Sequence, residues 1–204
     1  MNQTKEKGFT LIEVLVVTSL TVILAGGVLS LQYILGESQV TVWDSYLDTE
    51  EANRNVAALV REIRNARPSD TGAYALEVAS EDEVVFFSDI DFDSETERVR
   101  YTLTGETLEK GVIEPVGFPA TYPSENEKVK TVASHVKNAA GTTFTYYNGD
   151  WPADTTNNPL PAPARLSDTK LMKIHLEINT TEGGVSDNFV LETYANIRTL
   201  KENL

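Results

Sequence analysis

The feature that most constrains this chain is a long apolar run near its start, from Phe9 to about Leu35. A helix needs about 20 apolar residues to cross a bilayer, so the run is long enough to span a membrane. One charged residue, Glu13, interrupts it. A carboxylate near the bilayer centre costs on the order of 3 kcal/mol, and such residues usually have a partner or a function. The sequence therefore predicts a membrane-spanning helix with a functional acid near its beginning.

The local sequence offers Glu13 no cationic partner at helical spacing. The nearest cations, Lys5 and Lys7, do not stand three or four residues away, which is the spacing that pairs side chains along a helix. We therefore expect the partner of Glu13 to come from another chain, or to be created when this chain is processed.

The segment Gly8-Phe9-Thr10-Leu11-Ile12-Glu13 resembles the class III signal of type IV pilins and of the pseudopilins of type II secretion. In that family a membrane enzyme, the prepilin peptidase, cleaves after the glycine and methylates the new amino terminus. The resemblance implies that residues 1–8 are a leader ending at Gly8 and that Phe9 becomes the methylated N-terminus. It also implies that Glu13 pairs with the amino terminus of a neighbouring subunit during assembly. An α-amino group is largely protonated at neutral pH, so this pair would offset burial of the carboxylate.

Two other interpretations of the apolar run are weaker. An ordinary secretory signal has a core of about 7 to 15 apolar residues without an acid, although Ala25, Gly26 and Gly27 are small residues of the kind its peptidase accepts. A lipoprotein signal is excluded because the chain has no cysteine. A plain membrane anchor leaves Glu13 unexplained. The pilin-like interpretation accounts for all of these features.

Charge along the chain predicts its orientation and its partners. Lys5 and Lys7 precede the span, whereas Glu37 and Asp44 follow it, which keeps the leader in the cytoplasm and sends the rest outward. The prediction is a single-pass inner-membrane protein whose C-terminal domain becomes part of a periplasmic or cell-surface filament. The net charge of −14 argues against direct nucleic-acid binding, which depends on Lys and Arg contacting phosphates.

The predicted helix continues beyond the membrane. Residues 9–35 form its transmembrane half and residues 36–67 its extracytoplasmic half, which ends near Arg67 because Pro68 follows. Gly26 and Gly27 each weaken the helix by about 1 kcal/mol relative to alanine. These glycines fit either close helix packing or a flexible point used on entry into a filament.

The remaining residues, 68–204, are predicted to form one globular β-rich domain. Residues 129–136 fit either a helix or a strand, and Asn148-Gly149 is a strong hairpin signal. A final hairpin is expected across residues 182–184. The predicted fold class is α+β, with a long N-terminal membrane-spanning helix packed at its C-terminal half against an antiparallel β-sheet domain. The expected strands are 75–79, 84–88, 98–103, 107–112, 143–147, 171–179 and 189–197.

Weaker similarities concern the subtype. Residues 52–54 and 59–64, and residues 144–149 with a closing strand near Ile197, are similar to the J-type minor pseudopilin of type II secretion and to PilW-like minor pilins. Such a subunit is structural and not an enzyme. The implied partners are other pilin or pseudopilin subunits, the prepilin peptidase, an inner-membrane assembly platform and membrane lipid.

One acidic stretch, residues 89–97, is a candidate metal site. Asp89, Asp91 and Asp93 could converge on calcium, a hard cation that prefers oxygen ligands. The stretch departs from the EF-hand pattern, because Ser94 replaces the turn glycine and Arg100 stands where the bidentate acid belongs. The alternative is a solvated acidic turn whose aspartates cap backbone N–H groups.

The acidic stretch also supports an alternative function, a membrane-anchored calcium-dependent adhesin or enzyme that uses a pilin-like anchor. Glycine-rich phosphate loops, nucleophile elbows and HExxH motifs are absent from the sequence, which disfavours the enzyme. His175 alternates with Lys173 and Glu177 on the expected solvent face of a strand, as a surface histidine would. No cofactor other than calcium is suggested by the sequence.

Overall fold

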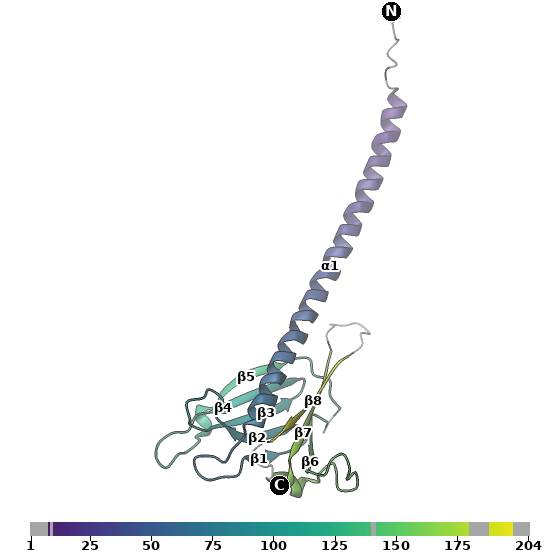
Figure 1. The fold of residues 1–204 in the computed structure, drawn as a ribbon. Coiled ribbons are helices and arrows are strands. Elements are labelled where there is room, and N and C mark those ends of the chain that lie inside the picture. Colours follow the sequence, from purple (N-terminus) through teal and green to yellow (C-terminus); the bar gives the residue numbers. More distant parts are fainter. Residues whose placement is uncertain (1–7, 9, 140–141, 180–187, 198–204) are drawn as a thin grey trace, which may run out of the picture. The chain divides into compact units, whose positions relative to one another are not determined.

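The computed structural model describes residues 8, 10–139, 142–179 and 188–197, with side chains left out of the description for residues 35–49 and 163. The chain divides into two compact units, Met1–Asp44 and Ser45–Leu204. Helix α1, Leu11–Arg64, supplies the regular structure of the first unit and the beginning of the second (Figure 1). The predicted long N-terminal helix is therefore present.

The part of α1 in the first unit is apolar and unburied. Leu11–Ile34 is long and apolar enough to cross a membrane, with a mean hydropathy of 2.4, and none of it is buried within the chain. Its side chains are apolar on every side of the helix, which is typical of a segment surrounded by lipid or by other helices.

The end of α1 lies in the second unit and has one buried face. Ala52, Val56, Leu59 and Ile63 are at most 2 % exposed and follow steps of three and four residues, as a core-facing helical stripe does. The helix ends at Arg64, three residues earlier than predicted. The correction has a local cause: the backbone N–H of Arg67 donates to the carbonyl of Phe87 at 2.9 Å, so the chain has already left the helix to pair with a strand.

The first sheet contains five antiparallel strands in chain order. These are β1 (Leu76–Ala79), β2 (Glu83–Ser88), β3 (Glu97–Thr104), β4 (Thr107–Ile113) and β5 (Lys128–Ala133). The ambiguous residues 129–136 form β5 and an isolated bridge between Val136 and Ile178. A short 3-10 helix, Ser124–Asn126, precedes β5.

The second sheet has three antiparallel strands, β6 (Phe144–Tyr147), β7 (Leu171–Ile178) and β8 (Phe189–Asn196), in that order. The hairpin predicted at Asn148-Gly149 is wrong, because β6 pairs with β7 only after a long connection that holds the short helices Ala162–Ala164 and Arg165–Asp168. The Asn158 side chain accepts the N–H of Asn148 at 2.9 Å and directs the chain into this loop. Residues 182–184, where the final hairpin turn was predicted, lie outside the described residues.

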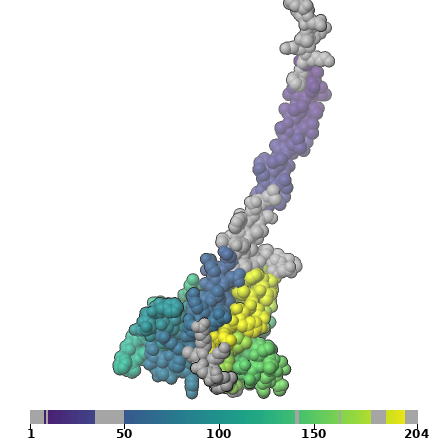
Figure 2. All heavy atoms as spheres, viewed as in Figure 1, coloured from purple at the N-terminus to yellow at the C-terminus, as the bar shows by residue number. Residues whose placement is uncertain are grey.

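Both sheets and the end of α1 share one hydrophobic core. Phe86 of β2 and Tyr101 of β3 stack with their ring centroids 6.2 Å apart. Alternate residues of β7 are buried, as expected for a strand with one face on the core. Figure 2 shows the last turns of α1 (blue) next to β8 (yellow). The predicted α+β class, a long apolar helix followed by antiparallel sheets, is confirmed.

Candidate functional site

The N-terminus of α1 is closed by a reciprocal pair of hydrogen bonds. The backbone N–H of Glu13 donates to Thr10 Oγ1 at 3.3 Å, and the backbone N–H of Thr10 donates to Glu13 Oε2 at 3.4 Å. This is a capping box, in which residues three apart each satisfy an N–H that the first helical turn leaves free. The spacing Thr10-x-x-Glu13 was visible in the sequence, and it gives Glu13 a local partner that the search for cations missed.

The capping contact leaves the Glu13 carboxylate able to accept a hydrogen bond from a stronger donor. Both hydrogen bonds are longer than the usual range of about 2.7–3.2 Å between nitrogen and oxygen, so they are weak. The side chain is also exposed. A carboxylate in the first turn is stabilised by the positive end of the helix dipole, and a stronger donor could replace the Thr10 N–H without leaving the acid unsatisfied.

Three glycines of the N-terminal unit have no structural requirement within the chain. A Cβ added at Gly8, Gly26 or Gly27 would meet no atom within 4 Å, and none of the three has a positive φ. Among the described residues, neither packing nor backbone geometry explains why glycine stands at these three positions. Phe9, the predicted mature N-terminus, lies outside the described residues.

The acidic loop after β2 brings together a different trio from the predicted one. Asp89, Asp91 and Glu97 each offer a carboxylate oxygen, and these oxygens lie within 4.8 Å of one another. Asp93 does not belong to this group. Its Oδ1 accepts the backbone N–H of Glu95 at 2.8 Å, which makes it a turn-capping residue.

Glu97 is the buried member of the trio. It is the first residue of β3, it is 2 % exposed, and its Oε2 accepts the backbone N–H of Ile90 at 2.8 Å. Burial raises its pKa above the ordinary value, and the charges of Asp91 and Asp93 add to this, while the Ile90 N–H opposes it. Glu97 is the last acid of the alternating stretch 89–97, but the prediction named Asp93 as the third ligand in its place.

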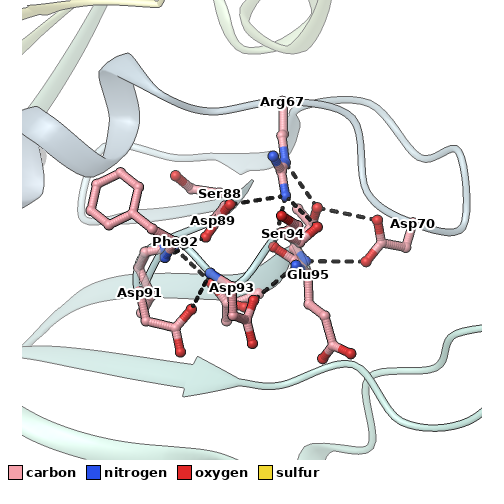
Figure 3. A network of polar contacts seen from close by, with 12 residues as sticks. Arg67, Asp70, Ser88, Asp89, Asp91, Phe92, Asp93, Ser94 and Glu95 are labelled. Carbon is pink, nitrogen blue, oxygen red and sulfur yellow. Dashed lines mark hydrogen bonds and ion pairs between the residues drawn. The ribbon is translucent and has the colours of Figure 1, made fainter.

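Arg67 joins this loop to the end of the helix (Figure 3). Its Nη2 donates to the carbonyls of Ser94 at 3.0 Å and Glu95 at 2.7 Å, and it lies 3.4 Å from the Asp89 carboxylate. Its Nε donates to Thr96 Oγ1 at 2.9 Å. A guanidinium can serve several acceptors at once because its donors form a planar fork. The loop is therefore held in one conformation by groups of this chain.

The titratable groups near β7 are paired with one another. His175 Nε2 lies 3.3 Å from Glu177 and its Nδ1 lies 3.4 Å from Glu192, so the predicted surface histidine is half-buried between two acids. Lys173 Nζ lies 2.9 Å from Glu192, and this hydrogen bond raises the lysine pKa. A lysine held protonated is a poor nucleophile, because nucleophilic lysines require a lowered pKa. This arrangement suits a charged sheet surface better than a catalytic centre.

Comparison with known proteins identifies the N-terminal segment. Residues 3–29 match the family model described as the prokaryotic N-terminal methylation motif. No curated protein matches the chain in sequence. Among solved structures, a chain of the GspK-GspI-GspJ complex from the type 2 secretion system of enterotoxigenic Escherichia coli aligns with a TM-score of 0.47 and 12 % identity. The alignment covers 74 % of this chain and 97 % of that chain.

Proposed function

Because residues 3–29 carry the N-terminal methylation motif of type IV pilins and pseudopilins, we propose that this chain is a minor pilin or pseudopilin. It is a structural subunit that the prepilin peptidase processes. It then takes part in the assembly or initiation of a type IV pilus or of a type II secretion pseudopilus. Its partners in this role are other subunits, the inner-membrane assembly platform and membrane lipid.

The proposed organisation follows the predicted boundaries. Residues 1–8 are the leader, residues 9–35 hold the subunit in the inner membrane, residues 36–67 continue the helix outside it, and residues 68–204 form the exported domain. The unburied apolar segment Leu11–Ile34 supports this assignment, because nothing else in the described chain covers it.

The main structural support for the proposal is the environment of the Glu13 carboxylate. Its carboxylate is exposed, stands within an apolar helix and is held by one weak backbone contact to Thr10. Cleavage after Gly8 would create an ammonium group on each subunit. Pairing that cation with the Glu13 carboxylate of a neighbour would give both charges a partner in surroundings of low dielectric constant, where an ion pair is far stronger than in water.

Replacing the carboxylate tests the assembly role. Glu13→Ala should leave cleavage largely intact and should strongly lower the share of subunit recovered in sheared filaments relative to the membrane fraction, measured by immunoblot. Glu51→Ala is the matched control, since Glu51 is an exposed acid on the same helix outside the apolar segment. Normal incorporation of the Glu13 variant would contradict the role.

Replacing the glycine tests the processing role separately. Gly8→Ala should accumulate uncleaved precursor, visible as a slower band on a gel, because the peptidase no longer finds the glycine that it recognises. Folding should be unchanged, since the added methyl group meets no described atom within 4 Å. Gly26→Ala, which also meets no atom within 4 Å, should be cleaved normally. Efficient cleavage of the Gly8 variant would argue against recognition of this glycine.

A calcium-dependent adhesin on a pilin-like anchor is the second candidate, and one observation favours it. Asp89, Asp91 and Glu97 offer three clustered oxygens of the kind that calcium prefers. Calcium binding would raise the melting temperature of the chain relative to the same sample in chelator, and Asp91→Asn should remove that rise. Equal melting temperatures in calcium and chelator would contradict calcium binding. Asp89 would then only hold the loop, through its contacts with Arg67 and with the Phe92 N–H.

A further inference from the structure

Several large apolar side chains of the second unit are exposed at one end of the first sheet. β1 and β3 begin at this end and β2 and β4 finish there, because the strands run antiparallel in chain order. The loops 65–75, 89–96 and 114–127 therefore emerge together, and we refer to them as the loop end. Their exposed apolar residues are Tyr74, Phe92, Val116 and Phe118.

The three loops are tied to one another. Asp70 in the first loop accepts the backbone N–H of Thr96 at 3.1 Å and lies 3.2 Å from its hydroxyl. Tyr122 in the third loop donates its hydroxyl to the carbonyl of Thr96 at 2.7 Å. Its ring packs on Phe87 of β2 with centroids 5.2 Å apart. A surface braced in this way can bind without first paying the entropy of ordering its loops.

Phe92 is held in a conformation that a phenylalanine rarely adopts. Its φ is 67°, in the left-handed region, where a bulky residue is strained. Its backbone N–H donates to Asp89 Oδ1 at 2.7 Å, and its ring points away from the polar network (Figure 3). The side chain is 74 % exposed, so packing within the chain does not offset this strain.

Phe118 is held in solvent by a small hairpin in the third loop. The backbones of Val116 and Thr121 exchange two hydrogen bonds, at 2.9 and 3.0 Å, and close a small hairpin. Gly117 follows with a φ of 78°, and the side chain of Phe118 is fully exposed beyond it. Two separate loops thus hold a phenylalanine in solvent at the same end of one sheet.

Charge at the loop end determines what could cover these rings. Asp91, Asp93 and Glu95 are exposed on both sides of Phe92, and Glu125 is exposed in the third loop. The chain as a whole has a net charge of −14, so a second copy or an anionic membrane surface would be repelled. A surface of complementary charge would be attracted.

We propose that the loop end is a docking surface for a protein partner that presents Lys or Arg side chains around apolar pockets, into which Phe92 and Phe118 insert. Aromatic anchors at the centre of an interface with a polar rim are the usual organisation of energetically dominant contact sites. The surface goes beyond the subunit role proposed above, and neither cleavage after Gly8 nor the Glu13 carboxylate contributes to it.

Site-specific photo-cross-linking of the full chain in cells that assemble it tests the proposal. The photoreactive residue p-benzoylphenylalanine replaces Phe92 or Phe118, one at a time, and cross-linked peptides are sequenced by mass spectrometry. Tyr194, an exposed aromatic of β8 in the other sheet, is the matched control position. Both test positions should cross-link one and the same protein, through a segment that contains Lys or Arg beside apolar residues, and the control position should not.

Two further variants keep the test independent of folding. With the photoreactive group at position 118, Phe92→Ala should lower the cross-link yield by about fivefold or more, as loss of a dominant anchor does. The combined change Asp91→Asn, Asp93→Asn and Glu95→Gln should lower it by a similar factor. The asparagines keep the Oδ1 atoms that accept Asp93 and Glu95 N–H groups, so the loop turns are retained. An unchanged melting temperature verifies this.

The cross-linking results distinguish the molecules that could cover the loop end. A common basic partner that depends on both the ring and the acids supports the proposal. Cross-links to a second copy of this chain, to lipid, or to a partner segment without cationic residues overturn it. Absence of any cross-link from both positions in cells that assemble the subunit also overturns it. Failure of the Glu13→Ala assembly test would leave these outcomes unaffected.

Discussion

The two ends of helix α1 show how one element can serve two environments. In Leu11–Ile34 none of the residues is buried, although the segment is the most apolar part of the chain. Toward the end of the helix, Ala52, Val56 and Leu59 are buried, whereas the exposed positions are mostly polar or charged. Periodicity, and not apolar content, decides which part packs against the chain's own sheets. The first segment has no such one-sided stripe, and the described part of the chain does not bury it.

Two glutamates on this helix show the same contrast between an exposed and a buried environment. Glu13 is exposed and has one long contact to Thr10, whereas Glu62 is buried and accepts the Tyr101 hydroxyl at 2.8 Å and the Lys110 ammonium at 2.7 Å. Burial and the neighbouring Glu62 charge raise the pKa of Tyr101 above its ordinary value, which already lies well above neutral pH, so the hydroxyl is a stable donor to Glu62. Glu62 therefore has two short contacts that fix it within the fold, whereas the Glu13 carboxylate has only the long contact to Thr10.

The largest expected difference between the two segments comes from one substitution made in each. Leu59→Ala should lower the free energy of unfolding of the β domain by about 3 kcal/mol, because it removes a fully buried side chain and leaves a cavity. Leu20→Ala, in the unburied segment, should change it by less than about 0.5 kcal/mol. Denaturant titration in mild detergent, followed by near-ultraviolet circular dichroism, measures both. Equal losses would mean that the apolar segment also stabilises the domain.

The glutamate comparison can be tested with a neutral isostere. Glu62→Gln should lower the free energy of unfolding by about 2 kcal/mol, since the half-buried Lys110 then keeps its charge without a counter-charge. Glu51→Gln, on the exposed face of the same helix, is the control and should have almost no effect. If Glu62→Gln were equally silent, the contact with Lys110 would not contribute to the fold.

A smaller effect on stability is expected at Phe92, because its side chain is proposed to bind a partner and not to stabilise the domain. Phe92→Gly should leave the domain as stable as before, or more stable by up to about 1 kcal/mol, because glycine adopts a positive φ without strain and no packing is lost. Thermal unfolding followed by circular dichroism measures this. A loss of several degrees would show that the ring packs within the chain and would remove the reason to assign it to a partner.

The smallest expected effect is the pH dependence of Glu97. Its pKa in the folded chain is raised above the ordinary 4.5, so the stability that it contributes is complete below that value and is lost as pH rises through the folded pKa. In chelator at pH 7, Glu97→Gln should therefore raise the melting temperature, and the difference from the unmodified chain should disappear at pH 4. Glu95→Gln, at an exposed position, is the control. A lower melting temperature at pH 7 would mean that the Ile90 hydrogen bond outweighs burial.

The sequence predicted well those elements whose signals are local. The helix stripe at Val56 and Leu59 and the alternating strand β7 follow from periodicity alone. The partners of Glu62 could not be predicted, because Tyr101 and Lys110 lie 39 and 48 residues away in the chain. No local pattern contains that information.

The same limit explains the errors in the loops. Asn148-Gly149 carries a strong hairpin signal, but Asn158, ten residues later, hydrogen-bonds to Asn148 and extends the connection. In the acidic stretch, spacing suggested Asp93, whereas burial at the start of β3 brings Glu97 to Asp89 and Asp91. Side-chain hydrogen bonds across several residues decided both cases.

The most direct test of the account is the intact mass of the chain purified from membranes of a cell that contains the prepilin peptidase, together with its N-terminal peptide. Processing after Gly8 should yield a chain that lacks residues 1–8, begins at Phe9 and is one methyl group heavier than the unmodified polypeptide. A mature chain that still begins at Met1, or that begins near Gly26 and Gly27, would contradict it, because Glu13 would then never face a neighbouring amino terminus.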